Sequence, residues 1–446
     1  MRINLPHPNK FAKIWEEVTG VALNKTVRGI VTDSREVRPG DLYIAISGDR
    51  VDGHTFIKDV FEKGAVCALV NSEIENADEQ LIKVNNTVST IGKMAKAWRN
   101  QFDIPVMGIT GSNGKTSTKE LLKHMLSAQF NIHATEGNFN TSIGLPLTLL
   151  RLTKENTISL LEMGANQPGD IAQLCEIAQP THGVITNIAP AHLEGFGTIE
   201  AVAKTKGELF ACLSKGVSFI NAADYRVGAL EILGDAISFG LTPECDYPAD
   251  IHHEKDGTIT LTVDAEEIPT HSVNLTFAKN VIACVAISRT LGLSWGEIRE
   301  NVASFQPPKG RCEVKNNGMI TIIDDTYNAN LESTVAAIDY LKAFSGNGQR
   351  IFVFGDMFEL GDLSQDQHRR VGEKCNEAEL SAVFTIGEET VTTDAIITYS
   401  ELHKHFDNKD DLLISLKSIV KDGDKVLVKG SRGMKMETIV EAMLAV

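Results

Sequence analysis

The sequence predicts an α/β protein with largely parallel sheets, and its length predicts more than one domain. Apolar runs that end at Gly, Asp, Asn or Ser alternate with segments of helical periodicity, as in successive β-α units. A chain of 446 residues is longer than one hydrophobic core usually supports, so two or three domains are expected. Hydrophobic and charged contents of 42% and 23% are ordinary for a folded protein.

The first two blocks of the chain are separated near residue 86. The first block contains a turn-like polar stretch, Thr32-Asp33-Ser34-Arg35, before an apolar strand. The second block, 87–310, opens with a predicted helix at 88–102. It ends at Pro307-Pro308-Lys309-Gly310, which the residue types predict to be a hinge or, equally well, a rigid surface turn.

The third block covers residues 311–446 and contains four strand candidates, each ending at Gly, Asp or Asn. These candidates are 320–324, 351–354, 382–386 and 425–428. Ligands of open α/β sheets bind at the carboxyl ends of such strands, so these polar strand ends are candidate site residues. By contrast, residues 216–269 show only a weak pattern of strands and turns.

Charge and cysteine content argue against a nucleic-acid-binding, a disulfide-bonded or a zinc-binding protein. The formal net charge of −16 disfavours nucleic acid as a partner, because phosphate backbones select basic surfaces. The seven cysteines include no C-x-x-C pair and are odd in number, which favours reduced thiols over disulfides or a zinc site. We expect a cytoplasmic protein, because the polar N-terminal segment lacks a signal-peptide core and no apolar run reaches membrane-spanning length.

The strongest single motif is the glycine-rich segment Gly108 to Ser117, GITGSNGKTS, with an apolar strand before it and a helical pattern after it. Glycines let backbone N–H groups turn toward phosphate oxygens, and the following helix N-terminus adds positive charge. Lys115 would reach the β- and γ-phosphates of a nucleotide, and the Thr116 hydroxyl would bind Mg²⁺. Ile109 departs from the strict phosphate-loop spacing, so the alternative is a plain glycine-rich turn with a surface lysine.

Glu162 ends an apolar strand pattern at 157–165, which places a carboxylate beside the expected phosphate site. A hard cation such as Mg²⁺ prefers an oxygen ligand of this kind. The competing interpretation is that Glu162 caps the turn before the helix predicted at 169–177.

His192 and Lys206 carry less information by themselves. His192 follows a strand at 184–188 and is a candidate ligand for a second metal, although a loop histidine is more often polar surface. Lys206 lies in a helical segment at 199–213, where a lysine is by default a solvated surface charge.

Together these segments resemble the Mur ligase family, the ATP-dependent ligases that build the peptide of the peptidoglycan precursor. The loop at 110–116 is similar to that family's phosphate loop, and the segments 162–165, 187–192 and 206–208 follow in the family's order. The resemblance spans nearly the whole chain. Matching segments in the outer blocks are Thr32–Arg35, Asp52–His54, Gly310–Arg311, Asp324–Asn330, Gly355–Gly361 and Val428–Glu437.

The resemblance implies three domains and a two-step reaction. The domains would be an N-terminal UDP-substrate-binding domain (1–86), a central P-loop ATPase-like domain (87–310) and a C-terminal Rossmann-like domain (311–446). A carboxylate would take the γ-phosphoryl group of ATP, and an amine would displace phosphate from the acyl phosphate. The outer blocks imply UDP-N-acetylmuramoyl-tripeptide as the acid and D-alanyl-D-alanine as the amine, with a bacterial, monomeric enzyme as the expectation.

The resemblance also implies a role for individual residues. Arg311 would contact a phosphate and act in catalysis together with Lys115. Thr116 and Glu162 would hold one Mg²⁺ ion, and His192 and a carbamylated Lys206 would help to hold a second; Glu162, His192 and Lys206 also belong to the implied catalytic set. The implied ATP-binding residues are Thr110, Gly111, Ser112, Asn113, Gly114, Lys115, Thr116, Ser117, Asn280 near the adenine, Arg311, and Asp325 at the ribose. The implied substrate residues are Ser34, Arg35, Asn138, Asn140, Thr141, Asn328, Asn330 and Asp356.

Three positions depart from the family's pattern. Thr141 stands where a second asparagine is usual, and Leu331 stands where a proline is usual. The segment Phe277-Ala278-Lys279-Asn280 replaces a glycine-x-histidine-asparagine pattern. The last departure affects the expected adenine contacts and leaves the phosphate loop unchanged.

Other functions remain open from the sequence. Another member of the same ligase family, such as a folate polyglutamate ligase or a different peptide-precursor ligase, would keep the central block and change the outer ones. A nucleotide-dependent regulator would bind ATP without acceptor-dependent turnover, and a phosphate-loop kinase would release a phosphorylated product. For the ligase, we expect the third domain to swing about 307–310 and carry Arg311 onto the phosphates.

Overall fold

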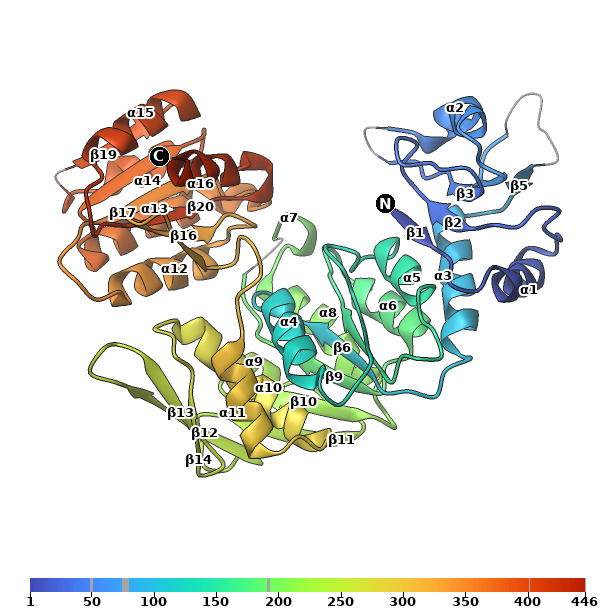
Figure 1. Cartoon of the computed structure of the whole chain (residues 1–446), viewed down its shortest axis with the longest axis horizontal. Coiled ribbons are helices and arrows are strands. Elements are labelled where there is room, and N and C mark those ends of the chain that lie inside the picture. Colours follow the sequence, from blue (N-terminus) through green and yellow to red (C-terminus); the bar gives the residue numbers. More distant parts are fainter. Residues whose placement is uncertain (49–50, 74–79, 191–192, 401, 446) are drawn as a thin grey trace.

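The computed structural model describes residues 1–48, 51–73, 80–190, 193–400 and 402–445. These residues form three sheets with helices packed against them, in three successive parts of the chain. Figure 1 shows the central part, in green and yellow, between the blue N-terminal part and the orange-to-red C-terminal part. The α/β prediction is confirmed.

The N-terminal sheet has the strand order β1-β2-β3-β4-β5, with only β1 antiparallel to its neighbour. Its strands are β1 (Arg2–Asn4), β2 (Gly29–Val31), β3 (Asp41–Ile44), β4 (Cys67–Val70) and β5 (Leu81–Lys83). Its helices are α1 (Pro8–Thr19), η1 (Gly53–Phe56) and α2 (Ile57–Glu62). Every residue of β2, β3 and β4 is buried, as expected for parallel strands covered on both faces.

Helix α3 (Thr87–Arg99) joins the N-terminal part to the central part. Asn86 caps its first turn by accepting a hydrogen bond from the Ser89 N–H, at 2.7 Å. The helix packs against α1 on one side and against two central helices on the other. Trp98, which is buried, donates from its indole nitrogen to the carbonyl of Leu152 at 3.1 Å. This shared helix therefore ties the first two domains together.

The central sheet has the order β14-β13-β12-β11-β10-β9-β6-β8-β7. The strands from β7 to β12 run parallel, and β12, β13 and β14 form an antiparallel edge. The strands are β6 (Val106–Thr110), β7 (Ile132–Ala134), β8 (Ile158–Glu162), β9 (His182–Ile185), β10 (Val217–Asn221), β11 (Asp235–Gly240), β12 (Tyr247–His253), β13 (Ile259–Val263) and β14 (Glu266–Pro269). The helices are α4 (Lys115–Leu126), α5 (Gly144–Leu149), α6 (Asp170–Ala178), α7 (Leu193–Phe196), α8 (Ile199–Ala211), α9 (Tyr225–Gly228), α10 (Leu275–Thr290) and α11 (Trp295–Ser304).

The C-terminal sheet has the order β15-β16-β20-β17-β18-β19, with only β15 antiparallel. Its strands are β15 (Glu313–Asn316), β16 (Thr321–Asp325), β17 (Arg350–Gly355), β18 (Ala382–Ile386), β19 (Leu402–Phe406) and β20 (Lys425–Lys429). Its helices are α12 (Leu331–Ala343), η2 (Gly361–Leu363), α13 (Ser364–Ala378), α14 (Thr390–Ile396), α15 (Lys409–Ile419), η3 (Arg432–Met434) and α16 (Glu437–Leu444). The four strands that the sequence predicts for this block are all present, within one or two residues.

The direction of chain travel in the central sheet reverses at β6, which lies between β8 on one side and β9 on the other. Loops that leave the carboxyl ends of these strands diverge there and leave a crevice. Thr110 ends β6, Glu162 ends β8 and Thr186 follows β9. The fold therefore brings the phosphate loop and the strand-end carboxylate to one edge.

The structure adds detail where the sequence pattern is weak. The segment 216–269 forms β10 to β14, whose edge strands are partly exposed and carry no long apolar run.

All seven cysteines are free, as expected. In the described part of the chain, no helix combines the length and the apolar character needed to cross a membrane.

Two domain boundaries follow from where the sheets end. The last strand of the first sheet ends at Lys83, and the first strand of the third sheet begins at Glu313. We therefore propose residues 86 and 310 as the boundaries. The segment 307–310 connects α11 to β15 and ends at Gly310, whose φ of 72° is in the left-handed region; its hinge role remains a proposal.

His133 is a buried histidine in the central core whose environment favours the neutral ring. Its Nε2 lies 2.8 Å from the carbonyl of Thr148 and its Nδ1 lies 2.8 Å from the hydroxyl of Ser159, so one nitrogen donates and the other accepts. Burial, the largest effect, lowers the pKa of His133 to about 4.

We predict that His133 makes the protein acid-sensitive. Below pH 6.5 the unfolded chain binds a proton that folded His133 does not take up until about pH 4. Stability should therefore fall by about 3 kcal/mol as the pH drops from 6.5 to 4. Denaturant titrations across this range measure the effect. The free energy of unfolding should depend less steeply on pH in His133→Gln. The dependence should stay unchanged in His252→Gln, which replaces an exposed histidine on β12. Equal pH dependence in the two variants would contradict the assignment.

Candidate active site

The loop between β6 and α4 has the backbone geometry of an anion-binding turn. Gly111 has φ 146°, and a Cβ there would lie 1.9 Å from the Thr186 hydroxyl. Gly114 has φ 85°, and a Cβ there would lie 3.0 Å from the side-chain oxygen of Asn280. No side chain caps the start of α4, so its first N–H groups are available to phosphate oxygens.

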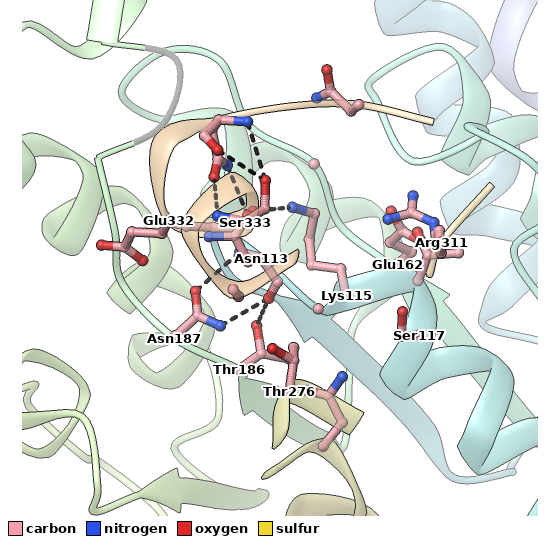
Figure 2. A pocket seen from close by; sticks show the side chains of 18 of the residues that line it. Asn113, Lys115, Ser117, Glu162, Thr186, Asn187, Thr276, Arg311, Glu332 and Ser333 are labelled. Carbon is pink, nitrogen blue, oxygen red and sulfur yellow. Dashed lines mark hydrogen bonds between the residues drawn. The ribbon is translucent and has the colours of Figure 1, made fainter. Parts of the chain in front are cut away.

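The end of β9 holds this loop in place through its polar residues. Asn187 accepts from the Asn113 N–H through Oδ1 at 3.0 Å and donates to the Asn113 carbonyl, also at 3.0 Å. The Ser112 N–H donates to the Asn187 carbonyl at 2.9 Å, and the Thr186 hydroxyl donates to the Asn113 carbonyl at 2.5 Å. Figure 2 shows Asn113 above Thr186 and Asn187 in this arrangement. The main chain of the loop is therefore held by hydrogen bonds from the end of β9.

Lys115 begins α4, and its side chain bends back over the loop. Its Nζ donates to the carbonyl of Gly111 at 2.7 Å and to that of Ser112 at 3.2 Å. Burial lowers the pKa of Lys115, the nearby Glu162 carboxylate raises it, and Arg311 lowers it. Desolvation destabilises the charged ammonium group, and an anionic partner restores its stability. A lysine in this environment is therefore suited to bind phosphate.

Glu162 is a buried carboxylate with two side-chain donors, and its main-chain N–H is bound as well. Its side chain accepts from the Thr116 hydroxyl and from the Asn140 amide, both at 2.8 Å. Its main-chain N–H donates to the Thr135 hydroxyl at 3.0 Å. The alternative that Glu162 caps α6 is wrong, because Glu208 accepts from N–H groups at the start of that helix.

Lys206 is buried on α8, at 2% exposure. The default interpretation of a solvated surface charge is therefore wrong, because a lysine in a helical pattern does not reveal which face packs inward. Burial lowers the pKa of Lys206 well below its usual value, and the positive charge of Lys115 lowers it further. A neutral amine is the form that these surroundings favour.

The third domain contributes a basic and aromatic wall. The guanidinium carbon of Arg311 lies 4.0 Å from the ring centre of Tyr327, and that of Arg432 lies 5.9 Å from the same ring. Asp325 is buried and accepts from the Cys312 N–H at 3.0 Å and from Lys429 Nζ at 2.5 Å. This carboxylate is thus held in a fixed position at the cavity edge.

A cavity of about 1200 Å³ connects the phosphate loop to the third domain. Its lining includes most of the site residues that the sequence predicts. These are Ser112, Asn113, Gly114, Lys115, Thr116, Ser117, Asn138, Asn140, Thr141, Glu162, Asn280, Arg311, Asp325, Asn328 and Asn330. The lining also includes polar residues that sequence reasoning missed as site residues, namely Thr186, Asn221, Asp224, Lys279, Tyr327 and Lys429. Thr186 and Asn221 stand at strand ends, which is a signal that could have found them.

Other predicted residues lie elsewhere. Thr110 is fully buried, and its hydroxyl donates to the Met163 carbonyl at 2.8 Å. Gly111 packs against Thr186 and does not line the cavity. Ser34 and Arg35 belong to the N-terminal domain, where the exposed Arg35 side chain is bound by Asp33 through both carboxylate oxygens. His192 lies outside the described residues.

Asp356, an implied substrate residue, is not among the residues that line this cavity. It is buried, and its carboxylate accepts from the N–H groups of Glu388, Glu389 and Thr390 at 2.9 to 3.1 Å. These bonds hold the loop before α14. Asp356 therefore fixes this loop, and its contact with the substrate stays a prediction.

The donor set fits a hard cation only in part. In the part of the chain that the structure describes, no three His, Cys, Asp or Glu side chains gather as a metal site. Thr116 and Glu162 nevertheless place a hydroxyl and a carboxylate 2.8 Å apart beside the phosphate loop. Oxygen donors of this kind suit Mg²⁺, with phosphate oxygens completing the coordination.

Three models of one protein family match this chain in sequence order. "Mur ligase family, catalytic domain" matches residues 26–99, "Mur ligase middle domain" matches 109–288, and "Mur ligase, glutamate ligase domain" matches 310–432. The UDP-N-acetylmuramoyl-tripeptide–D-alanyl-D-alanine ligase of Bacillus subtilis is 32% identical over 449 residues, covering 97% of each chain. The chain belongs to the Mur ligase family.

Solved structures of Mur ligases share the fold over nearly the whole chain. MurF from Acinetobacter baumannii has a TM-score of 0.87 and 28% identity, covering 98% of each chain. MurF ligase from Thermotoga maritima, solved in complex with ADP, has a TM-score of 0.83 and 32% identity, covering 93% of this chain and 97% of that one. The three-domain Mur ligase architecture predicted from the sequence is confirmed.

Asn140 should act on the metal through Glu162, because it donates to the carboxylate oxygen that Thr116 leaves free. We predict that Asn140→Ala weakens divalent metal binding by about 10- to 100-fold, as loss of a bond that orients a ligand does elsewhere. Titration with Mn²⁺ in the presence of ADP, followed by electron paramagnetic resonance, measures the affinity. Asn131→Ala, at an exposed asparagine of the same domain, is the control. Equal affinities in the two variants would contradict the role of Asn140.

Proposed function

We propose that this Mur ligase joins D-alanyl-D-alanine to UDP-N-acetylmuramoyl-tripeptide at the expense of ATP, giving the pentapeptide, ADP and phosphate in peptidoglycan precursor synthesis. The observation that carries the proposal is the cavity that brings a phosphate loop, Glu162 and Arg311 of the third domain to one space. The names of the relatives, and the ADP in the Thermotoga maritima complex, support the same reaction.

The chemical difficulty of this reaction is electrostatic. A carboxylate must approach an anionic phosphoryl group, and two like unit charges about 4 Å apart repel by roughly 4 kcal/mol at an effective dielectric of about 20. Lys115 and Arg311 line the cavity, and the charge of Arg311 is close enough to lower the pKa of Lys115. We infer that they neutralise the crowded anions and stabilise charge in the transition state.

The phosphoryl transfer and the amide formation are separate steps. The substrate carboxylate attacks the γ-phosphorus, the bond to the β–γ bridging oxygen breaks, and ADP leaves. The amine then attacks the acyl carbon, phosphate leaves, and the amine's extra proton passes to a base. The cavity walls serve to keep water from the acyl phosphate.

We place one Mg²⁺ ion at Thr116 and Glu162, and a second at His192 and a carbamylated Lys206. Bound there, the ions would supply positive charge to the phosphates. The burial of Lys206 supports the carbamate, because a neutral amine can add to CO₂ with loss of a proton. The product is an anionic oxygen ligand of the type that hard cations prefer.

The remaining predicted contacts are distributed over the three domains. Ser34 and Arg35 would bind the UDP end, and Asn280 and Asp325 would bind the adenine and the ribose of ATP. The cavity-lining asparagines 138 and 328, with Thr141, would contact the peptide parts. We propose a bacterial, cytoplasmic monomer that closes its third domain over the substrates.

The deciding experiment is ADP release with UDP-N-acetylmuramoyl-tripeptide, with and without D-alanyl-D-alanine. We expect release that depends on the dipeptide and an amide product, and single amino acids should replace the dipeptide poorly. ADP release without any acceptor dependence would favour a nucleotide-dependent regulator, and a stable phosphorylated product would favour a kinase. Lys115→Ala should reduce turnover by at least about 1000-fold, because the phosphates lose the positive partner that bends over the loop.

The carbamate on Lys206 predicts chemical rescue. Lys206→Ala should lower turnover by at least about 100-fold, because the second metal loses an oxygen ligand. Adding a small carboxylate such as acetate or formate should restore part of the activity. Lys204→Ala, two residues earlier on α8 and exposed, is the control that should remain active. Full activity of Lys206→Ala without any additive would reject the carbamate.

A further inference from the structure

Asn330 of the third domain forms a direct hydrogen bond to the phosphate loop. Its Nδ2 donates to the side-chain oxygen of Asn113 at 2.7 Å, across 217 positions of sequence. Figure 2 shows the first turn of α12, with Glu332 and Ser333, above Asn113 and opposite Thr186 and Asn187. The contact therefore joins two domains at the point where the nucleotide phosphates are expected.

The hydrogen-bond network fixes which amide atoms face each other. Asn330 is the N-cap of α12, and its Oδ1 accepts from the Ser333 N–H at 2.9 Å. Its Nδ2 is therefore the atom that faces the loop, and Asn113 must present its oxygen. The main-chain N–H and carbonyl of Asn113 already bind Asn187 and Thr186. The side chain of Asn113 is therefore available to accept the hydrogen bond from the third domain.

The same short segment also controls where Arg311 lies. Tyr327 precedes Asn330 by three residues, and its N–H donates to the Gly310 carbonyl at 3.0 Å. The Arg311 guanidinium lies 4.0 Å from the centre of the Tyr327 ring. A cation stacked on an aromatic ring has its direction set by that ring. The segment anchored at Asn330 therefore holds the Tyr327 ring against which Arg311 stacks.

We propose that Asn330 is a positioning residue that links the phosphate loop to Arg311 through Asn113 and Tyr327. The inference rests on the proposed function, and it gives Asn330 a different task from the substrate contact that the family resemblance implies. Nucleotide bound in the loop fixes Asn113, Asn113 fixes the segment 326–330, and Arg311 is thereby directed at the phosphates. Asn330 acts on the transfer step and does not hold the nucleotide itself.

Asn330→Ser is the most informative variant. Serine is a good N-cap residue, so α12 keeps its cap, while the shorter side chain cannot reach Asn113 and adds no charge. We expect kcat to fall at least about tenfold, with the Kd of Mg·ATP and the KM of D-alanyl-D-alanine changed less than about twofold. Asn113→Ala should do the same, because it keeps the main-chain bonds of the loop. The double variant should be no worse than either single one.

A direct role in gripping the dipeptide gives a different result. In that case Asn330→Ser would raise the KM of D-alanyl-D-alanine equally in the parent protein and in the Asn113→Ala background, and the effects on kcat would add. Either outcome overturns the proposal. Melting temperatures within about 2 °C of the parent protein would show that the cap is intact.

A second measurement does not depend on turnover. Hydrogen exchange of residues 326–333 should slow when the nonhydrolysable analogue Mg·AMP-PNP is added to the unmodified protein, and should not respond in Asn330→Ser or Asn113→Ala. Unmodified protein that binds the analogue without slower exchange in this segment refutes the link. Unmodified protein that binds no nucleotide refutes the proposed function instead.

Discussion

Two lysines of the site, one half-buried and one buried, set the central constraint of this molecule. Burial lowers the pKa of both Lys115 and Lys206, and the charge of Lys115 lowers the pKa of Lys206 further. Like charges in a poorly polarisable interior repel strongly, so the site is stable only if anions or a neutral amine offset that repulsion. Phosphate groups at Lys115 and a carbamate at Lys206 would convert the repulsion into attraction. The electrostatics of the site therefore favour an anion beside Lys115 and a neutral or negatively charged group at position 206.

The sequence reveals the parts of the fold whose physical signal is local. Largely buried parallel strands such as β8 and β17 consist mostly of apolar residues, and the phosphate loop carries its glycines where the backbone has positive φ. The edge strands β12 to β14 were only weakly visible, because their side chains are partly exposed and their pairing is not local. Lys206 was misjudged for a related reason, since the burial of a helical face depends on what packs against it.

Residues that serve the site indirectly are the hardest to recognise from sequence. Asn140 was expected to touch substrate, yet it donates to Glu162. Asp356 was expected to touch the dipeptide, yet it binds three backbone N–H groups. Polar residues in strand-end loops can serve either the ligand or the loop, and only the three-dimensional partners distinguish the two roles. Glu162 and Arg311 both line the cavity, and their roles there stay predictions.

The departure at 277–280 changes one wall of the cavity and leaves the phosphate site intact. Asn280 still lies against Gly114, so the helix that supports the loop keeps its polar contact. One turn earlier, Phe277 stacks on Phe305 with ring centres 5.6 Å apart and an angle of 7°, and both rings line the cavity. A flat apolar surface at this position favours contact with the face of a base over hydrogen bonds to its edge. Phosphate binding depends on backbone geometry and tolerates little change, whereas a cavity wall built from side chains can be rebuilt from different residues without disturbing the phosphate loop.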